Sequence, residues 1–353
     1  MKFRFSIIVF PLVLMFFALS FRQEIQKEKH FKNLRQLTFG GDNAEAYFSP
    51  DAKKIVFQSN NPKWNLQCDQ IFMMDLSVLP DTAFIPPMLS TGKGRTTCAF
   101  FMTGNRQILY SSTHLGSHSC PSTANLRAGG KYLWPVYNDY DIFVSDLAGN
   151  IIKQLTDTPG YDAEAVVSPK GDKIVFTSIR SGDLELWIMD IDGKNTRRLT
   201  HDLGYDGGAM FSPDGEKIVF RACRPETDEE INEYKENLAK GLVAPTRLEI
   251  FTMNVDGTGL QQVTNLGKAN WSPCFHPSGK KIIFSSNHLS QKGYDFQLFM
   301  INTDGTGLEQ ITAESIFNSF PNFSSDGKYF VFCSNRNNGG THDTNVFIAE
   351  WVE

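Results

Sequence analysis

Short apolar runs, rich in β-branched and aromatic residues, recur along almost the whole chain and are separated by Pro, Asp, Ser and Gly. Typical runs are Ile-Val-Phe-Gln-Ser at residues 55–59, Ile-Val-Phe-Thr-Ser at 174–178 and Ile-Ile-Phe-Ser-Ser at 282–286. Runs of this length, bounded by turn-forming residues, are typical of β-strands. The pattern therefore predicts an all-β protein.

Each run belongs to a longer unit that repeats six times along the sequence. The unit reads Phe-Ser-Pro-Asp-Gly, then Lys-Ile-Val-Phe-x-Ser, then Ile-Phe-x-Met-Asp-x-Asp-Gly, and it ends with Gln-Leu-Thr. Its first part lies at residues 46–51, 100–104, 167–171, 211–215, 275–279 and 323–327, and the second copy is the most eroded. Such self-similarity indicates a repeat architecture in which each unit packs on its neighbours.

Every unit is predicted to form four strands. Pro-Asp-Gly makes the turn between the first two strands, because Gly supplies the positive φ of a tight hairpin, and a second Asp-Gly turn follows the third strand. Third strands are predicted at residues 70–74, 141–145, 184–189, 249–253, 297–301 and 345–349. Fourth strands of the Gln-Leu-Thr type are predicted at residues 36–38, 88–90, 154–156, 198–200, 262–264 and 310–312.

The two ends of the repeat indicate how the array closes. A fourth-type strand at residues 36–38 precedes the first complete unit, and the last unit stops after its third strand. If the N-terminal strand completes the last unit, all six units have four strands and no edge stays exposed. We therefore predict a six-bladed β-propeller over residues 34–353, closed by its N-terminal strand.

The repeats resemble those of the TolB-type, WD40-like propeller family with its Pro-Asp repeat. The resemblance rests on the Gln-Leu-Thr and Ser-Pro-Asp-Gly-x-Lys-Ile-Val-Phe signatures, taken as a set, and extends over almost all of residues 34–353. It implies a six-bladed, largely periplasmic fold that often serves as a protein-docking surface. TolB itself carries an α/β domain before its propeller, and we expect no such domain here, so the resemblance implies the fold and not the same task.

The first twenty residues predict export. Lys2 and Arg4 precede an apolar run at residues 5–19, which is shorter than a bilayer-spanning helix, and Ala18 and Ser20 suit a signal-peptidase site. We predict a signal peptide at residues 1–20, a linker at 21–33 and a periplasmic or extracellular location. The alternative is an uncleaved N-terminal membrane anchor.

Composition excludes some functions. The net charge of −5 and the lack of a Lys/Arg-rich run give no basis for nucleic-acid binding. Six cysteines show no zinc-binding spacing, and we expect neither metal nor cofactor. A disulfide between Cys68 and Cys120 is favoured, with Cys98 as an alternative partner, while Cys223, Cys274 and Cys333 are expected to be free.

Long insertions mark one face of the predicted ring. Strand polarity places them all at the same end, opposite the Pro-Asp-Gly turns: residues 60–66, 113–139, 224–247, 287–295 and 335–344. In the fourth-blade insertion, Thr227, Glu230 and Gly241 predict the start and end of a short helix. Aromatic residues in the second-blade insertion either bind a partner or a sugar, or pin the loop to the surface.

A ring of polar residues is predicted where each innermost strand begins. Aligning the units gives Asn43, Arg95, Asp162, Asp206, Asn270 and Asn318, followed two residues later by Glu45, Thr97, Glu164, Gly208, Ser272 and Phe320. These side chains either bind a cation, a small ligand or a partner's peptide at the channel mouth, or simply tie down turns. Arg221 needs a buried partner, for which Asp206 and Glu164 are the candidates.

The function indicated by these patterns is binding, not catalysis. No Gly-x-Ser-x-Gly or His-Glu-x-x-His motif occurs, so no catalytic residue is assigned. We expect an exported scaffold of the cell envelope that binds another envelope or secreted protein through its loop-rich face. The alternative is a lyase or hydrolase acting on a saccharide or peptide at the channel mouth, with Glu45 and Glu164 available for acid–base work.

Overall fold

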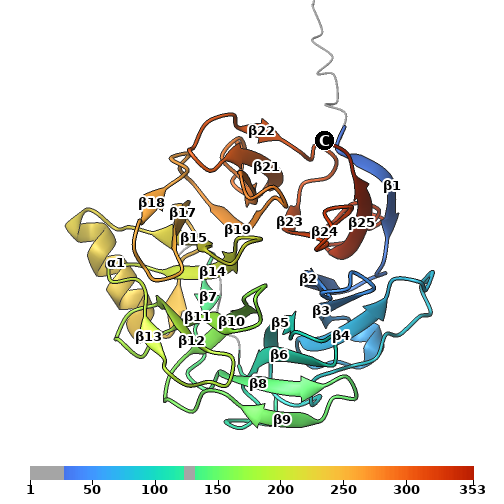
Figure 1. Cartoon of the computed structure of the whole chain (residues 1–353), viewed down its shortest axis with the longest axis horizontal. Coiled ribbons are helices and arrows are strands. Elements are labelled where there is room, and N and C mark those ends of the chain that lie inside the picture. The colour runs from blue at the N-terminus through green and yellow to red at the C-terminus, as the bar shows by residue number, and fades with distance from the viewer. Residues whose placement is uncertain (1–27, 123–131) are drawn as a thin grey trace, which may run out of the picture.

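Six antiparallel sheets surround a central axis in the computed structural model, which describes residues 28–122 and 132–353 (Figure 1). The predicted signal peptide lies outside the described residues. Blade one contains β2 (Asp42–Phe48), β3 (Lys54–Asn60) and β4 (Gln70–Asp75), followed by other blades of four strands each. The predicted all-β, six-bladed propeller is confirmed.

The next three blades follow in chain order around the ring. Blade two contains β5 (Thr96–Phe101), β6 (Gln107–Ser112), β8 (Asp141–Asp146) and β9 (Ile151–Gln154). Blade three contains β10 (Asp162–Val167), β11 (Lys173–Ser178), β12 (Glu185–Asp190) and β13 (Arg197–Arg198). Blade four contains β14 (Asp206–Phe211), β15 (Lys217–Cys223), β17 (Leu248–Asn254) and β18 (Gln261–Gln262).

The last two blades bring the chain back to its start. Blade five contains β19 (Asn270–Phe275), β20 (Lys281–Ser286), β21 (Gln297–Asn302) and β22 (Glu309–Gln310). Blade six contains β23 (Asn318–Phe323), β24 (Tyr329–Ser334), β25 (Asn345–Trp351) and the N-terminal strand β1 (Phe31–Gln36).

The N-terminal strand closes the ring, as predicted, but its bounds differ from the prediction. β1 runs antiparallel to β25 from Phe31 opposite Trp351 to Gln36 opposite Phe347, and Figure 1 shows the two ends of the ring meeting there. Half of the strand, residues 31–33, therefore lies within the segment predicted as a linker. Glu28, still further upstream, forms an ion pair with Arg336, whose side chain is 4% exposed.

In five blades the Gln-Leu-Thr segment begins at the last residue of the fourth strand and continues beyond it. Its threonine hydroxyl accepts from a backbone N–H of the third strand and donates to a side chain near the start of that strand. In blade four, Thr264 Oγ1 accepts from Ile250 N at 2.8 Å and donates to Glu249 Oε2 at 2.6 Å. The same hydroxyl anchor recurs at Thr38, Ser90, Thr156, Thr200 and Thr312.

Blade one differs from the others in its outermost strand. The segment predicted as its fourth strand, residues 88–90, pairs with β4 only through a single bridge between Phe72 and Met88. Its hydroxyl anchor is nevertheless present, because Ser90 Oγ accepts from Ile71 N at 3.0 Å. The blade is therefore held without a regular outer strand.

An aromatic pair crosses the middle two strands of every blade. Phe57 faces Phe72 in blade one, Phe284 faces Phe299 in blade five, and the second-strand member is completely buried. Equivalent pairs are Tyr110–Phe143, Phe176–Trp187, Phe220–Phe251 and Phe332–Phe347. Cross-strand aromatic pairs stabilise sheets, so the repeated phenylalanine of the sequence unit forms the core of each blade.

The predicted helix in the fourth-blade insertion is confirmed. α1 (Asp228–Ala239) starts at a capping box of Thr227 and Glu230, and Gly241 follows its end with φ +68°. Tyr234 packs its buried ring against the loop face of the ring. Among the described residues, no helix has the length and apolar character needed to span a bilayer.

Removing the closing strand should destabilise the whole ring. Deletion of residues 1–40 leaves the backbone of β25 without its partner, and we expect aggregation and a large fall in Tm. A chain starting at Glu28 keeps every described contact and serves as the control. Thermal melting and light scattering measure both, and equal melting of the two chains would contradict closure by β1.

The hydroxyl anchor gives a second stability prediction. Thr264→Val leaves the buried Ile250 N–H without an acceptor, so the free energy of unfolding should fall by about 1–3 kcal/mol. Thr264→Ser keeps the hydroxyl, as blade one does with Ser90, and should lower the free energy of unfolding by less. Denaturant unfolding of both variants provides the comparison, and a loss in Thr264→Val no larger than that in Thr264→Ser would contradict the stabilising role of the hydroxyl.

Candidate functional site

The insertions of blades two and four meet at the mouth of the central channel. β7 (Trp134–Pro135) from the second-blade insertion pairs antiparallel with β16 (Leu242–Val243) from the fourth-blade insertion. Val136 N also donates to Gly241 O at 2.7 Å, just after α1. The two insertions thus form one small two-stranded cover over the channel mouth, called the roof below, which consists of β7 and β16 and is continuous with α1.

Beneath this roof lies a cavity of about 800 Å³, to which all six innermost strands contribute. Each of these strands shifts register once, and the residue at the shift has a positive φ. These six residues all line the cavity: Glu45, Cys98, Glu164, Gly208, Ser272 and Phe320. Such bulges re-aim side chains, and here they present one residue from each blade to the channel.

Aromatic residues from the roof and the upper wall make up much of the remaining lining. Trp271 stacks on Phe296 with ring centroids 4.3 Å apart and lies 5.1 Å from the ring of Trp134. Others in the lining are Tyr132, Tyr137, Tyr140, Tyr161, Tyr205, Tyr294 and Phe317. Concave sites with aromatic walls and a few polar groups are typical of ligand pockets of this volume.

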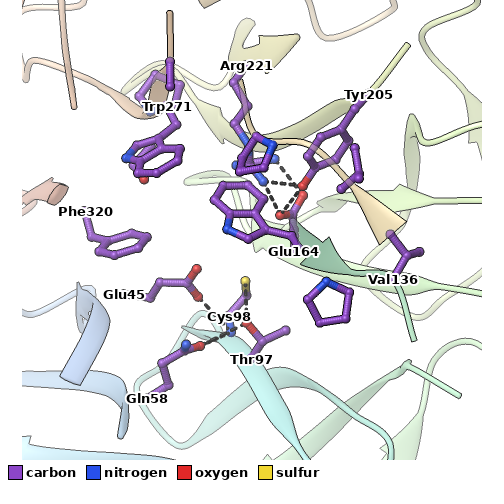
Figure 2. Close-up of a pocket in the computed structure, with 18 of the residues that line it drawn as sticks. Glu45, Gln58, Thr97, Cys98, Val136, Glu164, Tyr205, Arg221, Trp271 and Phe320 are labelled. Atoms are coloured by element: carbon purple, nitrogen blue, oxygen red, sulfur yellow. Dashed lines mark hydrogen bonds and ion pairs between the residues drawn. The ribbon is translucent and has the colours of Figure 1, made fainter. Parts of the chain in front are cut away.

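A buried ion pair spans blades three and four on one side of the cavity. Arg221 Nη2 contacts both Glu164 Oε1 and the Tyr205 hydroxyl (Figure 2). Glu164 also accepts from Thr177 Oγ1 at 2.7 Å and from Gly208 N at 2.9 Å. Burial raises the pKa of Glu164, but the Arg221 charge and these hydrogen bonds outweigh it, so the pKa lies below its usual value.

Two further contacts fix the position of Arg221. Its guanidinium carbon lies 5.2 Å from the ring centre of Trp134 and 5.0 Å from that of Tyr205. A Cβ on Gly208 would lie 1.7 Å from Arg221 Nη1, so the glycine leaves the space that the guanidinium occupies. Of the two candidate partners, Glu164 is thus the one Arg221 uses.

A second polar group lies around Glu45. Its Oε2 accepts from Cys98 N at 3.0 Å, while Gln58 Oε1 accepts from the same N–H at 3.2 Å and from Thr97 Oγ1 at 3.0 Å (Figure 2). Burial raises the pKa of Glu45 to about 7, because the hydrogen bond from Cys98 compensates for it only in part. The Glu45 carboxyl group therefore changes between its neutral and its charged form within the physiological pH range.

The predicted polar ring separates into two groups. Glu45, Glu164 and Arg95 line the cavity, whereas Asn43, Asp162, Asp206, Asn270 and Asn318 are buried between blades and are not part of the lining. The Asn270 amide, for example, donates to Leu248 O at 2.9 Å and to Gly267 O at 3.1 Å. The three asparagines each donate to a backbone oxygen of the preceding turn, which is the arrangement of the turn-stabilising alternative.

The two aspartates of this buried group each pair with an arginine from their own blade. Asp162 Oδ2 accepts from Arg180 Nη2 at 2.7 Å, and Asp206 Oδ1 contacts Arg224 Nη1. Burial raises the pKa of Asp206 to about 7 although the Arg224 charge opposes this shift. Asp206 is therefore not the partner of Arg221.

In blade two the predicted alignment is wrong by one residue. Thr96 pairs with Ser112 as Asp162 pairs with Ser178, so Thr96 holds the place assigned to Arg95. The residue at the bulge is accordingly Cys98 and not Thr97. Counting back three residues from the phenylalanine before the first turn, Phe101 in this unit, would have identified Cys98, as it identifies Glu45 from Phe48.

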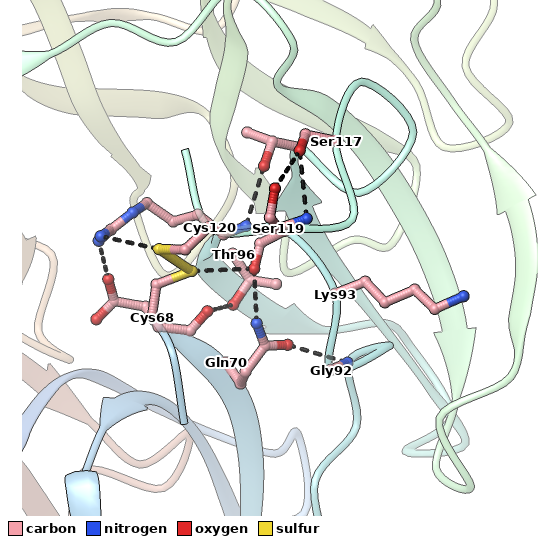
Figure 3. Close-up of a disulfide and its surroundings, with 12 residues drawn as sticks. Cys68, Gln70, Gly92, Lys93, Thr96, Ser117, Ser119 and Cys120 are labelled. Atoms are coloured by element: carbon pink, nitrogen blue, oxygen red, sulfur yellow. Dashed lines mark hydrogen bonds and ion pairs between the residues drawn. A yellow bond between two sulfur atoms is a disulfide. The ribbon is translucent and has the colours of Figure 1, made fainter. Parts of the chain in front are cut away.

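A disulfide joins Cys68, two residues before β4, to Cys120 in the second-blade insertion (Figure 3). This is the pairing that the sequence analysis favoured. Arg95 lies beside it, with Nη2 3.7 Å from Cys120 Sγ and Nη1 paired with Asp69. Cys98, Cys274 and Cys333 are buried and free, and Cys223 is free and half-buried.

The described residues contain no group of three or more His, Cys, Asp or Glu side chains arranged to hold an ion. The lining instead offers a titratable carboxyl group, an internally paired arginine and aromatic surfaces. These groups suit binding of an organic group by contact, charge and hydrogen bonding.

Comparison with known proteins supports the fold. Residues 138–228 match the model described as the TolB beta propeller domain, and no curated protein matches the sequence. The solved structure of a putative TolB from Agrobacterium tumefaciens is 19% identical, with a TM-score of 0.57 over 89% of this chain and 91% of that one. TolB from Acinetobacter baumannii is 18% identical, with a TM-score of 0.53 over 80% of this chain and 57% of that one.

A third solved structure, of a nidogen/laminin complex, is 12% identical, with a TM-score of 0.50 over 77% of this chain and 80% of that one. At these identities the likeness shows the fold alone. It confirms the six-bladed propeller fold that the repeat predicts, and residues 138–228 are similar to the TolB beta propeller domain.

Loss of the disulfide should loosen the roof. Cys120→Ser removes the link across 52 residues, and we expect the free energy of unfolding to fall by about 2–4 kcal/mol. Cys274→Ser, at a buried free thiol, keeps the disulfide and is the control: a reductant should destabilise it as it destabilises the wild type, whereas Cys120→Ser should not respond to the reductant. Peptide mapping without reductant should recover the peptides of Cys68 and Cys120 joined; any other pairing would contradict the structure.

Glu45 should make stability depend on pH. Its pKa is higher in the folded protein than in an unfolded chain, so wild-type stability should fall as pH rises from about 4.5 to about 7 and then level off. Glu45→Gln removes this contribution, and its Tm relative to the wild type should therefore rise between pH 5 and pH 8. A constant Tm difference over that range would contradict the raised pKa.

Proposed function

We propose that this protein is an exported binding module of the cell envelope that holds another protein at its loop-rich face. The observation that carries the proposal is the roofed cavity, where two long insertions pair over a channel lined by all six blades. The stability of the six blades alone would not require two distant insertions to pair over the channel. Export is part of the proposal and rests on the pattern of residues 1–20.

The rim of the cavity has the composition of a contact surface. Tyr132 and Tyr294 lie on the lining with 46% and 52% of their surface exposed, and Lys292 lies beside Tyr294. Large aromatic side chains at the edge of a pocket supply contact area at a low cost in conformational entropy, as is typical of residues that dominate binding energy. The opposite face offers the Pro-Asp-Gly turns, whose aspartates are used to cap the turns themselves.

The alternative of catalysis has weaker support. Glu45 has a pKa suited to proton transfer, but Glu164 is fully engaged with Arg221, Tyr205, Thr177 and Gly208. A second free carboxyl group is therefore missing from the described lining, and general acid–base work by this pair has no second member.

Crosslinking from either face tests the proposed binding face. A photoreactive residue in place of Tyr132 or Tyr294 should capture a defined envelope protein, whereas one in place of Asp214, in a Pro-Asp-Gly turn on the opposite face, should not. Replacing both Tyr132 and Tyr294 by Ala should lower the affinity for the same partner at least tenfold. Capture from Asp214 alone would place the interface on the other face and contradict the proposal.

A further inference from the structure

The charges that line the cavity are paired with each other, except for two. Glu164 neutralises Arg221, and Asp69 neutralises Arg95. Lys292 is exposed at the rim, over the ring of Tyr294. The remaining charged group is Glu45, which forms no ion pair among the described residues and projects from the wall between aromatic side chains.

The surroundings of Glu45 are those of a cation site. Figure 2 shows its carboxyl group extending into the space bordered by Phe320, Trp271 and the Arg221–Glu164 pair. Among the described residues only Cys98 hydrogen-bonds to this carboxyl group, with its backbone N–H at 3.0 Å from Oε2 and with its thiol, and a carboxylate has further acceptor positions for a ligand. Aromatic faces attract an organic cation through their electron density, and a partly desolvated carboxylate adds a direct charge contact.

The same surroundings disfavour other ligands. A divalent metal ion requires several oxygen or nitrogen ligands, and the described residues provide no such group around Glu45. An anion would meet Glu45 without gaining a free positive charge in the wall, because Arg221 and Arg95 are already paired. The cavity of about 800 Å³ accommodates a small organic molecule or the side chain of a docked protein.

We propose that the cavity binds an organic cation, an alkylammonium or guanidinium group, with Glu45 as its charge partner and Phe320 and Trp271 as its aromatic walls. The cation is carried either by a free small molecule or by a lysine or arginine of the protein held at the loop face. In the second case the proposal rests on the proposed function. It also identifies the ligand-binding carboxylate as Glu45, and not Asp162 or Asp206, which have arginine partners of their own.

Cation binding must be linked to proton release. Glu164 lies near Glu45 and disfavours its ionisation, whereas the hydrogen bonds from Cys98 and the charge of Arg221 favour it; the neutral Tyr47 and Cys333 complete the surroundings. Because Glu45 is protonated below about pH 7, an entering cation displaces its proton. The affinity for a cation should therefore fall about tenfold for each pH unit below 7 and become constant above it.

Binding of matched charged and neutral probes to the purified protein tests the proposal. Choline is compared with 3,3-dimethylbutanol, and the peptide acetyl-Gly-Gly-Lys-Gly-Gly-amide with its acetyl-lysine form, by calorimetry and by the fluorescence of the tryptophans at the cavity. At pH 8 at least one cationic probe should bind about tenfold or more tightly than its neutral partner. Glu45→Gln should abolish both this preference and its pH dependence, while Glu236→Gln, on the exposed side of α1, should change neither.

The possible outcomes separate the two proposals. Preference for the charged peptide alone supports a protein-borne cation and the proposed docking role. Preference for choline alone supports the cation site but contradicts a protein as its source. Equal binding of charged and neutral probes in both pairs, or an unchanged preference in Glu45→Gln, overturns the cation site. In that case crosslinking through Tyr132 and Tyr294 still decides whether the loop face binds a protein.

Discussion

The whole ring depends on a hydroxyl group that is repeated at every blade. At the end of each Gln-Leu-Thr segment, a threonine or serine side chain accepts a backbone N–H of the third strand and donates to the residue that starts that strand. In blade six this group is Thr38, so the N-terminal segment is held by the anchor as well as by β1. The first residue of the third strand then contacts the next blade, as Asn345 contacts Asn43, which links neighbouring blades around the ring.

Much of the fold could be predicted from the sequence because the repeat encodes it several times. An error in one copy is corrected by the other five, and the phenylalanine pairs, the turn aspartates and the helix cap all have simple local causes. The bounds of the fourth strands could not be predicted in the same way. Polar side chains such as Thr264 look like strand residues in a sequence, although they serve as anchors at the strand end.

The candidate site was predicted only in part, because its residues come from a backbone irregularity that leaves no clear pattern. A register shift in each innermost strand decides that Glu45 and Glu164 face the cavity while Asn43 and Asp162 are buried between blades. In blade two no Asn or Asp marks the start of the strand, so the alignment slipped to Arg95. The pairing of β7 with β16 joins residues more than a hundred positions apart in sequence, and no local signal announces it.

The six bulges also separate the lining of the channel from the packing of the blades. Each bulge residue has a backbone conformation set by the strand shift, while the residue that follows it, alanine in four blades and proline in two, is buried. The side chains found at this one position range from carboxylate through thiol, hydroxyl and phenyl to none at all. Specificity in such a ring can therefore diverge by substitution at single bulge positions, except where neighbouring bulges are coupled, as Glu164 and Gly208 are through Arg221.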